Sequence, residues 1–180
     1  MSKRVLLGVT GSIAAYKAAE LVRLLCKAGC EVTVVMTAAA TRFVAPLTFR
    51  TLSGNPVAVD MFPEPPPERV PHIALADWAD ALVVAPCTAN VAAKLAHGIA
   101  DDLLSCTALA CDAPLVLAPA MNVRMWRHGA VTANLAVLRE RGAVVLEVGS
   151  GELACGTEGP GRMLEPAAIA DAVLGVLSPR

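Results

Sequence analysis

The residues best suited to chemistry lie in a glycine-rich segment near the end of the chain, residues 149–163. Within it, Cys155 stands between Gly151 and Gly156. A glycine-rich loop of this length inside a compact domain is usually functional. Such a loop could close over a substrate, bind it through backbone N–H groups and present the thiol as its reactive group. The alternative is an ordinary surface loop with an incidental thiol.

Two short turns carry small polar side chains directly after apolar runs. Gly11 and Ser12 follow one such run, and Thr88 and Asn90 follow another. Glycine permits close backbone approach, and the helix start after each turn attracts an anion. Each turn alone is equally consistent with an ordinary strand-to-helix turn or a helix cap. Together, at one edge of a sheet, the two turns favour a nucleotide-like ligand.

Four further side chains could act on a substrate. Asn122 stands where an apolar strand ends and a helix begins, so its amide can hold a carboxylate or cap the helix. Met125 and Trp126 suit a flat apolar ligand, although core packing is the commoner use of such residues. His72 follows a proline-rich stretch, and a lone histidine is usually structural or solvated.

The composition argues against several classes of function. Of the 180 residues, 56% are hydrophobic and 17% are charged, and the net charge is −1. A membrane helix needs roughly 20 consecutive apolar residues, and no such run is present. With two Trp, one Tyr, three Phe and no basic block, nucleic-acid binding has little support. The apolar surplus is better explained by interfaces between copies of the chain, so we expect a homo-oligomer.

The cysteines and the first residues favour a cytoplasmic protein. None of the six cysteines forms a C-x-x-C pair, so we expect buried reduced thiols at the five cysteines other than Cys155, and no metal site. The first residues lack the continuous apolar core and the small-residue cleavage site of a signal peptide.

The pattern of elements predicts one α/β domain over residues 1–180. Strands that alternate with helices predict a doubly wound parallel sheet, whose ligands bind at the carboxyl ends of the strands. The strands are expected at residues 4–10, 31–36, 80–85, 115–118 and 143–148. The helices are expected at 14–28, 37–43, 46–54, 89–97, 101–111, 123–141 and 166–177, with loops at 63–71 and 149–163.

Five motifs together resemble the homo-oligomeric flavin-containing cysteine decarboxylases, and they occur in the order of that family. The resemblance implies a flavodoxin-like, Rossmann-like fold, bound FMN, and trimers or dodecamers of trimers with active sites between subunits. The motifs are Gly11-Ser12-Ile13-Ala14-Ala15, Pro71-His72-Ile73, Pro86-Cys87-Thr88-Ala89-Asn90-Val91, the P-x-M-N-x-x-M-W of Pro119 to Trp126, and the substrate clamp from Leu153 to Met163.

The resemblance also implies roles for individual residues. His72 resembles the active-site base, Asn122 the residue that grips the substrate carboxylate, and Cys155 the proton donor on the clamp. Substrate-binding positions are Asn122, Met125, Leu153, Ala154 and Gly156. The positions that match the family's FMN contacts are Gly11, Ser12, Ile13, Thr37, Ala38, Ala39, Thr88, Ala89, Asn90, Val91 and Ala120.

Within that family, the clamp is most similar to that of the enzymes of coenzyme A synthesis. This implies decarboxylation of 4′-phosphopantothenoylcysteine to 4′-phosphopantetheine, with a fused or separate phosphopantothenoylcysteine synthetase as a partner. The alternatives are a peptidyl-cysteine decarboxylase of peptide-antibiotic maturation, a flavin prenyltransferase and a non-catalytic FMN-binding regulator. The chain departs from the family pattern at Val91, where a hydroxyl is usual, and at Asp77, where many members carry a basic residue.

Overall fold

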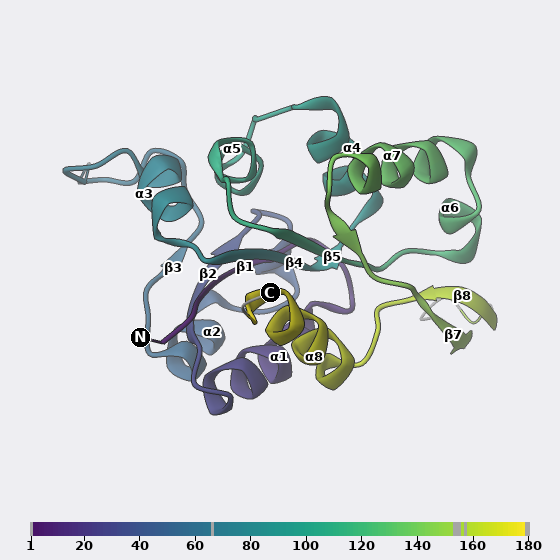
Figure 1. The fold of residues 1–180 in the computed structure, drawn as a ribbon, viewed down its shortest axis with the longest axis horizontal. Helices are drawn as coiled ribbons and strands as arrows, with labels where there is room; N and C mark the ends of the chain where they lie inside the picture. The colour runs from purple at the N-terminus through teal and green to yellow at the C-terminus, as the bar shows by residue number, and fades with distance from the viewer. Residues whose placement is uncertain (1, 66, 153–155, 157, 179–180) are drawn as a thin grey trace.

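The computed structural model describes residues 2–65, 67–152, 156 and 158–178. Its centre is a parallel sheet in the order β3-β2-β1-β4-β5-β6, so the predicted doubly wound fold is confirmed (Figure 1). The strands are β1 (Arg4–Val9), β2 (Glu31–Met36), β3 (Val57–Ala58), β4 (Ala81–Cys87), β5 (Leu115–Pro119) and β6 (Val144–Val145).

Helices cover both faces of this sheet. One face carries α1 (Ala15–Lys27), α2 (Pro46–Ser53) and α8 (Pro166–Leu177) (Figure 1). The other face carries α3 (Pro71–Trp78), α4 (Ala89–His97), α5 (Leu103–Ala110) and α7 (Gly129–Glu140). A 3-10 turn, η1 (Ala40–Arg42), and a one-turn helix, α6 (Val123–Trp126), lie in the connections after β2 and β5.

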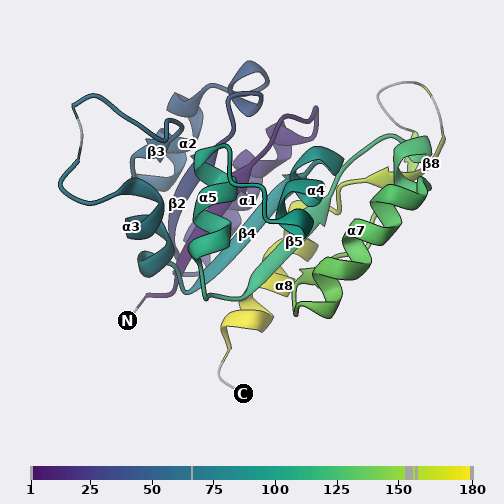
Figure 2. The ribbon, with the colours of Figure 1, turned by 90° about the horizontal axis from the view of Figure 1, so that it is seen from above.

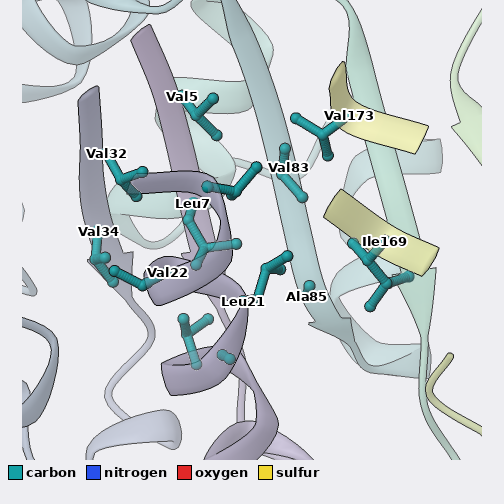
Figure 3. Packing of buried hydrophobic residues seen from close by; sticks show 14 of the residues in the cluster. Val5, Leu7, Leu21, Val22, Val32, Val34, Val83, Ala85, Ile169 and Val173 are labelled. Atoms are coloured by element: carbon teal, nitrogen blue, oxygen red, sulfur yellow. The ribbon is translucent and has the colours of Figure 1, made fainter. Parts of the chain in front are cut away.

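The central strands are buried on both faces because successive side chains alternate between the two helical layers. In β1, Val5 and Leu7 face α1 and α8, whereas Leu6 faces the other layer. Figure 3 shows Leu21 of α1 and Ile169 of α8 packed over the first of these faces. All five side chains are fully buried, so truncating any one to alanine would cost about 2–5 kcal/mol.

The strand order reverses between β1 and β4, and that reversal determines where a ligand can bind. The chain runs outward from β1 through β2 to β3, then returns to place β4 on the other side of β1. The helices that follow β1 and β4 therefore lie on opposite faces and leave a crevice at the carboxyl ends of these two strands. Figure 1 shows β1 and β4 side by side in the sheet, and Figure 2 shows the same sheet from above.

Two expectations for the second half of the chain are wrong. The predicted helix at 123–141 is broken into α6 and α7, because His128 is extended and caps α7 by accepting the Ala130 N–H on Nδ1 at 3.2 Å. The predicted loop at 149–163 contains an antiparallel hairpin of β7 (Gly149–Glu152) and β8 (Glu158–Arg162).

Three smaller differences concern short elements. The helix α3 begins at Pro71, the last residue of the predicted proline-rich loop, and the edge strand β3 has only two residues; neither element was expected. The expected strand at 143–148 is reduced to β6, also of two residues. Within the described ranges, no helix is both long enough and apolar enough to cross a membrane.

Candidate functional site

A cavity of about 570 Å³ opens at the carboxyl edge of the sheet, over the reversal point between β1 and β4. It collects every predicted cofactor residue except Ile13, which lies outside the lining with 60% of its surface exposed. The lining consists of Gly11, Ser12, Thr37, Ala38, Ala39, Thr88, Ala89, Asn90, Val91, Lys94, Asp102, Ala120, Met121 and Met125.

The turn after β1 approaches the turn after β2 so closely that residue 11 has no room for a side chain. A Cβ added to Gly11 would lie 2.5 Å from the Cβ of Ala39 and 3.2 Å from its carbonyl carbon. The Ser12 hydroxyl accepts the backbone N–H of Ala14 at 3.2 Å and so shapes the start of α1. Backbone and small side chains therefore form this wall, which a flat ligand can approach closely.

The ends of β1 and β4 are joined by a residue that the sequence did not single out, Thr10. Its hydroxyl is fully buried, donates to the Pro86 carbonyl at 2.7 Å and accepts the Thr88 N–H at 3.2 Å. This places the turn after β4 beside the turn after β1. A hydroxyl at the end of an otherwise apolar strand is the signal that could have revealed it.

The turn after β4 starts α4 in the expected way. Thr88 caps the helix by accepting the Val91 N–H at 3.3 Å, while Asn90 is exposed and lines the cavity. Beneath the turn, complete burial raises the pKa of the Cys87 thiol to about 12. Since only a thiolate is strongly nucleophilic, Cys87 is a packing residue rather than a reactive one.

An ion-pair cluster contributes two residues to the cavity lining, and it was not predicted from the sequence. The Lys94 ammonium lies 2.6 Å from Asp101 Oδ1 and 2.8 Å from Asp102 Oδ2, and Lys94 and Asp102 both line the cavity. Burial alone would raise the pKa of Asp102. Hydrogen bonds from Lys94 and from the backbone and hydroxyl of Ser105 more than offset this and hold the pKa below its ordinary value.

The connection after β5 brings Asn122 to the same edge. Met121 and Met125 line the cavity on either side of it, and Asn122 caps α6 by accepting the Arg124 N–H on Oδ1 at 2.8 Å. The helix-capping role expected for Asn122 is therefore confirmed through its side-chain oxygen, and the carboxylate-binding role stays a prediction.

The β7–β8 hairpin packs against this connection. Met121 donates its backbone N–H to the Gly161 carbonyl at 3.0 Å. Gly156, in the connection between the two strands, is exposed. Three predicted clamp residues, Leu153, Ala154 and Cys155, lie outside the described residues.

His72 does not line the cavity of its own chain, and neither do Ile13 and Asn122. His72 lies in the first turn of α3, which stands at the opposite end of the molecule from the hairpin (Figures 1 and 2). Its buried Nδ1 has no hydrogen-bond partner among the described residues. Such an orphaned polar atom is uncommon in a folded protein and calls for an explanation.

The cavity suits a flat heteroaromatic ligand with an anionic end. Small side chains and backbone form its walls, and hydroxyl-bearing turns precede the two helices that begin at the crevice, α1 and α4. Helix starts bind phosphate through backbone N–H groups.

Comparisons with known proteins give a consistent picture. A family model described as Flavoprotein matches residues 1–178. The coenzyme A biosynthesis bifunctional protein CoaBC of Bacillus subtilis (strain 168) is 52% identical over 165 residues, which are 92% of this chain and 41% of that protein. The chain thus spans about two fifths of the length of such curated relatives.

Two solved structures are similar over nearly the whole chain. A mutant of PPC decarboxylase complexed with pantothenoylaminoethenethiol has a TM-score of 0.85 at 34% identity and covers 97% of both chains. The FMN-dependent cysteine decarboxylase SpaF has a TM-score of 0.82 at 35% identity and covers 98% of both chains.

Proposed function

Because this chain belongs to the flavoprotein family, we propose that its cavity binds FMN and that it decarboxylates 4′-phosphopantothenoylcysteine to 4′-phosphopantetheine. The observation that carries the proposal is the meeting of the turns after β1, β2, β4 and β5 around one cavity at the reversal point of the sheet. The similarity to CoaBC and to PPC decarboxylase supports the choice of substrate.

The residues present fit FMN. Gly11 leaves the wall without a side chain, so an isoalloxazine ring can lie against backbone. The start of α4, capped by Thr88, offers backbone N–H groups to the phosphate. Val91 is almost fully buried, so the hydroxyl that the family usually carries there is replaced by packing.

The reaction needs an electron sink, because a carboxylate beside a carbon bearing only nitrogen and CH₂SH has none. Oxidation of the thiol to a thioaldehyde provides a C=S group that accepts the electron pair as CO₂ leaves, which gives an enethiol. Bound FMN would supply that two-electron oxidation and return the electrons afterwards. The ligand of the similar mutant structure, pantothenoylaminoethenethiol, is itself an enethiol.

The side chains of the protein would orient the substrate and move protons. Asn122 would grip the substrate carboxylate, with its amide held by the Arg124 N–H and flanked by Met121 and Met125. Cys155 would protonate the enethiol carbon when the product forms. His72 would act as the acid–base group, a role that imidazoles commonly fill near neutral pH.

His72 would serve the cavity of a second copy of the chain. The position of α3 at the opposite end of the molecule from the hairpin and the buried Nδ1 of His72, which has no partner among the described residues, support this arrangement. The high apolar content of the chain, 56%, is consistent with an interface between copies.

The central test is a single incubation of purified protein with 4′-phosphopantothenoylcysteine, followed by mass spectrometry and by the visible flavin spectrum. We expect yellow protein and a product lighter than the substrate by CO₂. A peptide that ends in cysteine serves as the competing substrate. Yellow protein that acts on the peptide alone would reassign the substrate, yellow protein without any product would leave a non-catalytic binder, and protein that cannot take up FMN would refute the proposal.

The sharing of the site between copies has its own test. His72→Asn and Asn122→Asp are each expected to be inactive alone. Co-expressed, they should regain activity at about a quarter of the sites, because random mixing pairs an intact His72 with an intact Asn122 of the neighbouring copy. Mixed oligomers that stay inactive would place both residues in the same protomer.

A further inference from the structure

We infer that Gly161 is a positioning residue for the clamp: it docks the β7–β8 hairpin directly on the segment that carries Asn122. The inference rests on the proposed function for its chemical consequence, but the docking itself is a contact between described residues. It implies that the carboxylate grip and the proton-donating segment are placed by one backbone contact.

The contact leaves no space between the two segments. Gly161 is buried in β8, and its carbonyl accepts the Met121 N–H at 3.0 Å. A Cβ added at position 161 would overlap the Met121 carbonyl oxygen, which is backbone and cannot swing away. Position 161 also has φ +134°, a region that side chains disfavour.

A second glycine of β8, Gly159, lies similarly close to the connection after β5. A Cβ added to Gly159 would lie 3.0 Å from Cγ2 of Val123, the first residue of α6. The β8 strand therefore follows the connection from Met121 to Val123 through its glycines, with Asn122 between the two contacts.

The base of the hairpin is held separately. Met163, directly after β8, is 97% buried and packs in the core beneath α1 and α8. Glu165 Oε1 accepts a hydrogen bond from the Lys17 ammonium of α1 at 2.7 Å. The same oxygen lies 3.9 Å from the Arg162 guanidinium. The stretch of β8 from Gly159 to Gly161 therefore depends on these two glycines for its place beside Asn122.

The chemical consequence concerns the last step of the proposed reaction. Residues 153–157 connect β7 to β8, so Cys155 is carried by a segment whose ends are fixed by the hairpin. Thiol oxidation and loss of CO₂ do not consume the Cys155 proton, whereas return of the electrons to the enethiol does. Displacing β8 should therefore slow the conversion of enethiol to product more than the steps before it.

The test is Gly161→Ala, with two controls in the same hairpin. Gly151→Ala has the same backbone strain, at φ +142°, but its new Cβ would meet only the movable guanidinium end of Arg162 at 2.9 Å. Gly149→Ala would meet nothing closer than 3.6 Å.

We expect Gly161→Ala to bind FMN as the parent does and to release CO₂, but to accumulate a species two hydrogens lighter than the product. Conversion of that species should slow about a hundredfold, the order that a misplacement near 1 Å produces. Both controls should form product within about threefold of the parent rate. Hydrogen exchange adds a readout independent of activity: the Met121 amide should lose protection in Gly161→Ala and keep it in both controls.

Several results would overturn the inference. Product formation by Gly161→Ala at the parent rate would show that the docking does not position the clamp, and equal slowing in Gly151→Ala would assign the effect to backbone strain. A parent protein that fails to decarboxylate would refute the proposed function instead, while the exchange result would still decide the docking.

A second pair of variants applies if Gly161→Ala does not fold. Gly159→Ala should accumulate the same species, because its new Cβ would meet Cγ2 of Val123. Val123→Ala removes that Cγ2, so the double variant Gly159→Ala/Val123→Ala should partly recover product formation. No restoration would show that contact with Val123 is not what places the strand.

Discussion

The cavity wall and the β7–β8 hairpin are built in opposite ways, although they meet at the same edge of the sheet. The wall consists of turns that each follow directly on a buried strand, and Thr10 joins two of them through a fully buried hydroxyl. The hairpin has no sheet beneath it and reaches its place through the glycines of β8, the buried Met163 that follows β8, and the ion pair of Glu165 with Lys17.

The difference suits the two tasks of the proposed enzyme. A cofactor that stays bound through many turnovers needs a preformed site, and buried strand ends supply one. A clamp must admit a new substrate in each cycle, so a segment that lies outside the central sheet and is held by few contacts is appropriate.

The largest expected effect is on the wall. Gly11→Val places a branched side chain where even a Cβ would lie 2.5 Å from Ala39 Cβ, so the turns after β1 and β2 must separate. We expect flavin content to fall more than tenfold, with a loss of about 1–3 kcal/mol in unfolding free energy from overpacking. Visible absorbance per protein measures the first effect and urea unfolding the second. Gly129→Ala, where a Cβ meets nothing within 4 Å, is the control. Full flavin content in Gly11→Val would contradict this prediction, because it would mean that the turns after β1 and β2 can separate without loss of the cofactor site.

Thr10→Val tests how strongly the two halves of the wall are joined. The substitution keeps the shape of the side chain but leaves the Pro86 carbonyl and the Thr88 N–H without their partner. A buried unsatisfied group costs about 1–3 kcal/mol, so both unfolding free energy and FMN affinity should fall. Thr10→Ser, which retains the hydroxyl, should recover most of the loss. Unfolding free energies of Thr10→Val and the parent that agree within error would contradict this role.

Much of the wall could be predicted from the sequence because its determinants are local. Gly11 and Ser12 directly follow β1, and Thr88 both follows β4 and caps α4, so strand, turn and helix start are read from adjacent residues. The Lys94 cluster was not predicted, because Lys94 meets Asp101 and Asp102 only once α4 and α5 are packed.

The hairpin could not be predicted from its own residues. Gly149 to Glu152 and Glu158 to Arg162 are rich in glycine and proline, which have low strand propensity, so a loop was the natural expectation. Their strands depend on the contact with Met121, a tertiary interaction that local patterns do not contain. The break at His128 was missed for a related reason, since its ring caps α7 in a way that its residue type rarely signals.

The Lys94 cluster gives a pH test of the wall. The pKa of Asp102 is lower in the folded state, so the stability it contributes is present above the ordinary carboxyl pKa of about 4 and is lost as pH falls below it. Lys94→Met should cost about 1 kcal/mol of unfolding free energy at pH 7, in the range of partly exposed ion pairs. The difference from the parent should shrink toward pH 3, because Asp102 is then protonated in the unfolded chain. Urea unfolding at both pH values measures this, and a difference that grows at low pH would contradict it.

The smallest expected effect distinguishes the ion pair of Glu165 from the glycine contacts of β8 as the interaction that places the hairpin. Glu165→Gln weakens the pairing with Lys17 and Arg162, but Glu165 is mostly exposed, with 67% of its side chain accessible, so the loss should be only a few tenths of a kcal/mol. The hydrogen bond from Lys17 also lowers the pKa of Glu165, so this small contribution should vanish in acid as the carboxylate is protonated.

Product formation by Glu165→Gln should match the parent, because Gly161 and Gly159 still hold β8 beside Asn122. Mass spectrometry under the conditions used for Gly161→Ala decides the point. If Glu165→Gln accumulates the enethiol as strongly as Gly161→Ala does, the clamp is placed by the ion pair at its base, and the glycine contacts follow from that placement rather than cause it.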